Sequence, residues 1–153
     1  MRELDVVGVR VEMPSNQPLV LLRERDGERY LPIWIGAVEA AAIAFAQDGT
    51  PTPRPLTHEL MHHIIDTLGD SLTAVQIDKV EDGVFYATLT FASGATLSAR
   101  PSDSIALALR SGTRIEAAES VLDEAGIVMS LDEEDEVQKF REFLSEVEPE
   151  DFA

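Results

Sequence analysis

The chain has 153 residues, of which 44% are hydrophobic, and a formal net charge of -17. This length is typical of one domain, and the hydrophobic fraction is large enough to fill a core. Cysteine is absent from the sequence, which excludes disulfides and thiolate metal sites. The longest uncharged apolar run, residues 40–46, is too short to span a membrane, and no apolar signal segment follows Met1. We therefore expect a cytoplasmic protein with no membrane partner.

The negative charge is concentrated toward the C-terminus. Residues 116–153 hold fourteen acidic and two basic residues, whereas residues 1–115 hold fifteen acidic and ten basic ones. Nine of those ten bases are arginine, which suits bidentate contact with phosphate or carboxylate. Since the sequence has no basic run, nucleic acid would have to bind in a local pocket rather than on a basic face.

Hydrophobic periodicity divides the chain into strands, where it has a period of two, and helices, where apolar residues recur every three or four positions. In chain order we expect strands at 3–13, 19–22 and 30–35, helices at 37–47 and 58–68, strands at 72–79, 84–91 and 95–99, a helix at 103–110, and a short strand and helix at 114–116 and 120–125. Asp-Gly pairs at 26–27 and 82–83 predict hairpin turns. This order favours an α+β fold, a single compact domain with a mixed, mostly antiparallel sheet and three main helices.

Two further stretches have their own character. Residues 50–56 contain three prolines, so we expect an extended loop there, with Thr57 as the N-cap of the following helix. The acidic run at 132–136 precedes apolar residues at helical spacing, which predicts an amphipathic helix. We expect residues 1–127 to form the domain and residues 128–153 an acidic C-terminal helical extension. Its apolar stripe docks on the domain itself or on a partner.

The segment Arg54-Pro-Leu-Thr-His-Glu59 brings an arginine and a histidine to the start of an expected helix. Helix N-termini present free N–H groups and favour anions, so Arg54 is a candidate phosphate-binding residue. His58 is a candidate for proton transfer near neutral pH. The alternative is an arginine paired with a surface carboxylate beside a solvated histidine.

The segment Arg100-Pro-Ser-Asp103 repeats this layout at the next helix. Arg100 and Ser102 are further candidates for binding phosphate, and the two helix starts would then converge on one anion. The alternative is that Ser102 caps the helix while Asp103 serves its dipole. Glu39, in the first turn of an apolar helix, is open to the same two interpretations.

The run from His58 to His62 also matches H-E-x-x-H, the zinc metalloprotease helix. Helical spacing places the two histidines on one face, as zinc requires. A catalytic zinc site needs a third protein ligand, and the sequence offers none at the usual spacings, because His63 is adjacent and Glu81 lies at a hairpin. A zinc hydrolase is therefore a minor alternative.

Four segments in order resemble the bifunctional nuclease (DNase/RNase) family over roughly residues 1–127. They are Leu31-Pro-Ile-Trp-Ile-Gly36 with Glu39-Ala40, Arg54-Pro-Leu-Thr-His-Glu59, Gly83-Val-Phe-Tyr-Ala87 and Arg100-Pro-Ser-Asp-Ser-Ile-Ala-Leu-Ala-Leu-Arg110. The resemblance implies a compact α/β domain, a homodimer or larger assembly, and a capacity to degrade DNA and RNA. Two positions depart from the family, which often has aspartate where this chain has Ser98 and Glu59. His62 is not part of the family pattern.

The resulting hypothesis is a nuclease that hydrolyses phosphodiester bonds, assisted by Mg²⁺ or Mn²⁺. The candidate catalytic residues are His58, Glu59 and Asp103, the phosphate-binding residues Arg54, Arg100 and Ser102, and the metal ligands Glu39, Glu59 and Asp103. The rival is a non-catalytic homodimeric binding module in which the same arginines and carboxylates form buried ion pairs. An open cleft favours the enzyme, and mutual satisfaction of these groups in the interior favours the module.

Overall fold

The computed structural model describes residues 1–12 and 14–128. Its elements are β1 (Arg2–Glu12), β2 (Gln17–Glu24), β3 (Arg29–Trp34), α1 (Ala37–Asp48), α2 (Thr57–Thr67), β4 (Leu72–Glu81), β5 (Val84–Phe91), β6 (Thr96–Ala99), α3 (Pro101–Ser111), β7 (Ile115–Ala117), α4 (Glu119–Ala125) and β8 (Ile127–Val128). Within this part of the chain the strands form one eight-stranded sheet in the order β6-β5-β4-β7-β1-β2-β3-β8. The β4–β7 pair is parallel and the other neighbours are antiparallel.

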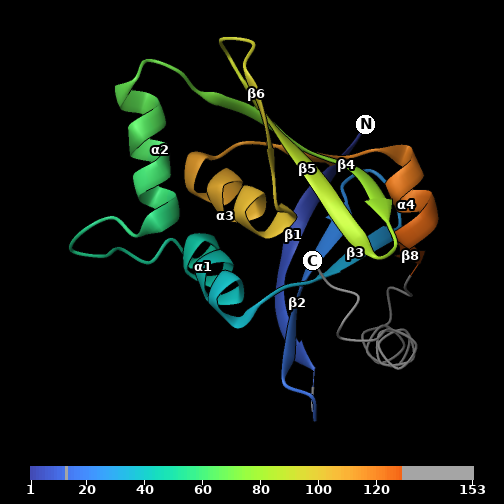
Figure 1. Ribbon diagram of the computed structural model, residues 1–153. Helices are drawn as coiled ribbons and strands as arrows, with labels where there is room; N and C mark the ends of the chain where they lie inside the picture. The colour runs from blue at the N-terminus through green and yellow to red at the C-terminus, as the bar shows by residue number, and fades with distance from the viewer. Residues whose placement is uncertain (13, 129–153) are drawn as a thin grey trace.

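The α+β fold with a mixed, mostly antiparallel sheet is therefore confirmed. Figure 1 shows α1, α2 and α3 gathered on one side of the sheet and α4 on the other. α1 packs against β1 and β2, α3 packs against β4 and β5, and α2 packs against α3. The amphipathic helix expected after residue 128 lies outside the described residues. No helix among the described residues is long and apolar enough to cross a membrane.

Strands β2 and β3 are buried along most of their length, which explains their nearly continuous apolar sequence. Proline cannot donate a hydrogen bond to a neighbouring strand, so it is confined to free edges. Pro32 has a strand neighbour on one side only. β2 lies beside it, whereas β8 pairs only with Arg29 and Tyr30 of β3 and does not extend to Pro32.

The expected N-caps of two helices were wrong. α2 begins at Thr57 itself, with Leu56 in the cap position, and α3 begins at Pro101, with Arg100 in the cap position. Proline is favoured at the first position of a helix, because its fixed φ suits the helix and its missing N–H would have no partner there. Pro101 therefore takes that place, and Ser102 enters the helix as a buried residue instead of capping it.

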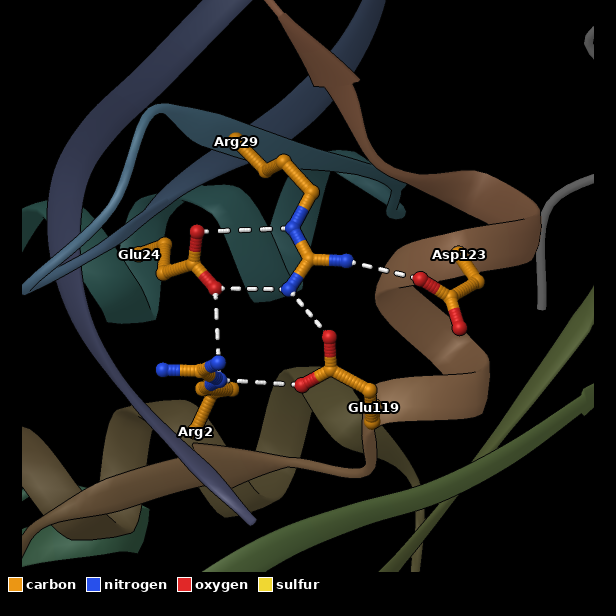
Figure 2. A network of polar contacts seen from close by, with 5 residues as sticks. All are labelled: Arg2, Glu24, Arg29, Glu119 and Asp123. Atoms are coloured by element: carbon orange, nitrogen blue, oxygen red, sulfur yellow. Dashed lines mark hydrogen bonds and ion pairs between the residues drawn. The ribbon is translucent and has the colours of Figure 1, made fainter.

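Ion pairs fasten α4 to the ends of three strands (Figure 2). Arg29 on β3 contacts Glu24 on β2 at 2.8 Å, and Glu119 and Asp123 on α4 at 2.8 and 2.9 Å. Arg2 on β1 reaches the same Glu119 at 2.9 Å. Hydrogen bonding from Arg29 lowers the pKa of Glu24, so this buried carboxyl is ionised at neutral pH.

Candidate active site

The first turns of α1, α2 and α3 meet around one cavity of about 390 Å³. Its lining residues are Val38, Glu39, Ala41, Ala42, Phe45, Leu56, Thr57, His58, Glu59, Arg100, Asp103 and Arg110. Each of the three helices carries an acid in its first turn, where the helix dipole favours negative charge. The convergence of the three helix starts therefore brings Glu39, Glu59 and Asp103 to one cavity, although they lie in separate motifs of the sequence.

A chain of polar contacts links residues that line this cavity. His58 Nε2 lies 3.1 Å from Asp103 Oδ1, and the other oxygen of Asp103 accepts a hydrogen bond from Arg100 Nε at 3.0 Å. Arg100 Nη1 in turn donates to Glu39 Oε1 at 3.0 Å. His58 is thus held in one orientation by a carboxylate that is itself held by a guanidinium, an arrangement suited to proton transfer.

Arg100 is the electrostatic centre of the cluster. Its hydrogen bond to Asp103, and then its contact with Glu39, raise its pKa, so the guanidinium stays charged at all relevant pH. A guanidinium has five N–H donors. The side chain is more than half exposed, and the contacts to Asp103 and Glu39 use three of its donors, which leaves donors for an anion in the cavity.

Glu59 and Arg110 form a looser pair on the other side of the cavity. Arg110 Nη1 lies 4.0 Å from Glu59 Oε2, and His63 lies 4.0 Å from the other oxygen of the same carboxylate. Arg110 is mostly buried and lines the cavity. Sequence reasoning did not name Arg110 as a candidate residue, although it closes the longest of the four motifs.

Two expected phosphate-binding residues lie apart from this cluster. Ser102 is only 3% exposed and is not in the lining of the cavity. Arg54 is exposed and also lies outside the lining, two positions before Leu56, which belongs to it. Within residues 1–12 and 14–128 its guanidinium forms no ion pair.

Two of the three carboxylates already share a cationic partner. Glu39 and Asp103 already face Arg100, and in the described part of the chain no three His, Asp or Glu side chains gather into a group that would hold a metal ion. The two histidines of the H-E-x-x-H match also have different partners. His58 contacts Asp103 on α3, whereas His62 contacts Asp66 on its own helix at 3.4 Å.

The apolar wall of the cavity comes from α1. Val38, Ala41, Ala42 and Phe45 follow one another at helical spacing, so they share one face of the helix. Val38 is 81% exposed and Phe45 is 45% exposed, so part of this face is accessible to a ligand. Sequence reasoning missed this wall, because in an alanine-rich helix the spacing alone does not tell which apolar face is buried.

A histidine oriented by a carboxylate can transfer protons, and arginines beside it in an open cavity can bind an anion. The chain matches the model of the bifunctional nuclease domain over residues 20–130. It therefore belongs to the bifunctional nuclease domain family, and the match includes the whole cavity lining.

Two kinds of relative resemble the chain. A protein known from two strains of Mycobacterium tuberculosis, named only as uncharacterised, is 53% identical over 99% of this chain and 98% of its own length. Bifunctional nuclease 2 of rice, Oryza sativa subsp. japonica, is 27% identical over 127 residues, which are 78% of this chain and 39% of the rice protein.

Proposed function

We propose that the protein is a cytoplasmic nuclease that hydrolyses phosphodiester bonds of DNA and RNA in the cavity between α1, α2 and α3. The observation that carries this proposal is the contact chain from His58 through Asp103 to Arg100. Membership of the bifunctional nuclease domain family supports it.

Hydrolysis needs a water molecule to lose a proton as its oxygen bonds to phosphorus, while one ester P–O bond breaks and the leaving oxygen gains a proton. His58 is the residue proposed to move these protons, and Asp103 fixes the orientation of its ring. Arg100 and Arg110 would neutralise the non-bridging oxygens, whose charge must be balanced in the transition state. Glu59 would hold Arg110 near the phosphate.

Assistance by Mg²⁺ or Mn²⁺ is a separate proposal. Because Glu39 and Asp103 already pair with Arg100, we assign no step of the reaction to a metal ion. The cleavage assay measures any requirement directly, by comparing added Mg²⁺, added Mn²⁺ and a chelator. Activity that survives chelation would contradict metal assistance.

The test is cleavage of RNA and DNA by highly purified wild-type protein beside two variants confirmed to be folded. His58→Ala should lose roughly a hundredfold or more in rate, the scale of a general acid–base residue. His62→Ala is the matched control, since His62 is on the same helix and also pairs with a carboxylate, but does not line the cavity. It should keep wild-type activity. Equal trace activity in all three proteins would mean contamination and would refute the nuclease proposal.

A second candidate function, a homodimeric binding module, is favoured by the outer face of α2. Leu60 and Ile64 on α2 and Leu68 just after it lie four positions apart, so they form one stripe, and they are 47% to 79% exposed. A contiguous apolar stripe on a charged protein marks an interaction surface. We propose that it makes the chain a homo-oligomer, most simply a dimer about a twofold axis.

The oligomer is tested by size-exclusion chromatography with light scattering, which measures the mass of the eluting protein. Wild type should have twice the monomer mass, and Ile64→Glu should be a folded monomer. Wild-type protein that is monomeric at high concentration would contradict the dimer. A dimer that binds RNA and DNA without cutting either would favour the module over the enzyme.

A further inference from the structure

The proposed hydrolysis uses the polar half of the cavity and leaves its apolar half without a role. On that half, Ala41 and Ala42 lie between Val38 and Phe45 on the same face of α1. Two small side chains between two larger ones leave a slot, with a partly exposed phenyl ring at one end. Such an exposed ring is suited to contact with a flat apolar group.

The opposite half of the cavity holds donors for an anion. Arg100, Arg110 and His58 line it beside the carboxylates Glu39, Glu59 and Asp103, and Arg100 keeps donors that these carboxylates do not use. A ligand that satisfies both halves carries a flat ring a short distance from a negatively charged group. A nucleotide has this chemistry, with a base for the slot and a phosphate for the guanidiniums.

The charge of the protein argues against a substrate that is held along its phosphate backbone. A duplex is held mainly by basic side chains that track its phosphates, and the chain has a net charge of -17 without a basic run. Affinity must therefore come from contacts inside the cavity. A base that is stacked in a duplex cannot enter a cavity of about 390 Å³ unless it is first extruded, whereas an unpaired base can.

We propose that the cavity takes a single-stranded nucleic acid, with one unpaired base stacked on Phe45 and its phosphate at Arg100 and His58. This inference deepens the proposed nuclease function and rests on it for the position of the phosphate. Phe45 acts as a binding residue that selects unpaired strands, while His58 acts on the bond to be cut.

The test measures binding and cutting separately on the full chain. A short fluorescent single strand with phosphorothioate linkages, and the same strand annealed to its complement, are titrated with protein in a fluorescence anisotropy assay. Phe45→Ala and Phe45→Leu remove the ring, and Phe45→Trp keeps a stacking surface. Tyr86→Ala is the matched control, because Tyr86 is an aromatic residue of similar exposure outside the cavity.

We expect wild type to bind the single strand more tightly than the duplex. Phe45→Ala and Phe45→Leu should lose roughly ten- to a hundredfold in affinity, the range found for one stacked base, while Phe45→Trp and Tyr86→Ala bind as wild type. Equal affinity for both substrates would overturn the inference. So would a Phe45→Leu variant, shown to be folded by circular dichroism, that binds as tightly as Tyr86→Ala.

Parallel cutting of unmodified strands separates this inference from the proposed function. If the single strand binds through Phe45 but is not cut, the nuclease proposal fails and the binding site stands. If wild type cuts duplex and single strand equally, and cutting depends on His58 but not on Phe45, the nuclease proposal stands and the single-strand site is refuted.

Discussion

Replacing Glu24 with glutamine should destabilise the fold by about 2 kcal/mol. Glu24 is only 5% exposed and receives two hydrogen bonds from Arg29, at 2.8 and 3.4 Å (Figure 2). A hydrogen bond to a charged group contributes about 1.5 to 3 kcal/mol, and glutamine keeps one acceptor at this place. In the variant Arg29 also keeps its contacts with Glu119 and Asp123. The loss of stability therefore stays below about 3 to 5 kcal/mol, the cost of leaving a buried charge without a partner.

Asp123→Asn is the matched control, since Asp123 contacts the same arginine but its side chain is 66% exposed. Exposed ion pairs contribute about 0 to 1 kcal/mol, so this variant should remain close to wild type. Urea denaturation near neutral pH measures both free energies of unfolding from the transition midpoints. If Glu24→Gln and Asp123→Asn have equal effects, burial does not determine the strength of these pairs and the reasoning is refuted.

The difference in the free energy of unfolding between wild type and Glu24→Gln should depend on pH. Arg29 lowers the pKa of Glu24 in the folded protein, so the stabilisation is present above the unfolded pKa of a glutamate, about 4.3. It is lost as pH falls through the lower pKa of the folded state, because the protonated carboxyl then resembles glutamine. The difference between wild type and Glu24→Gln should therefore shrink in acid. A difference that stays constant below that range would contradict an ionic origin.

Two further predictions concern the cavity. In Gly36→Ala the new Cβ would lie 2.3 Å from Glu39 Oε2, so the substitution should displace this carboxylate from Arg100. Cleavage, measured as kcat on a single strand, should slow by up to about a hundredfold. An unchanged kcat would show that Glu39 does not position Arg100. The second prediction concerns salt. A plot of the logarithm of the affinity for a single strand against the logarithm of the salt concentration should have a slope no steeper than about -2, because two arginines line the cavity. A slope several times steeper would indicate phosphate contacts outside the cavity.

Much of the candidate site could be predicted from sequence because its polar residues lie in short local motifs. His58 follows a proline-rich loop at a helix start, and Asp103 follows Arg-Pro at another. Their contact could not be predicted, since the two residues are 45 positions apart and meet only when α2 packs on α3. Ser102 shows the opposite case, because its motif favours a phosphate contact but the first turn of α3 turns its side chain into the interior.

The sequence by itself determined the approximate positions of strands β1 to β7 and of the four helices, but not of the short strand β8, because period and turn residues act over a few neighbours. It also determined the family, through four short motifs. Only the tertiary structure decided that β7 pairs in parallel with β4, that three helix starts share one cavity, and that Phe45 faces it. These features depend on which surfaces are buried together, and burial is a property of the packed chain rather than of any one segment.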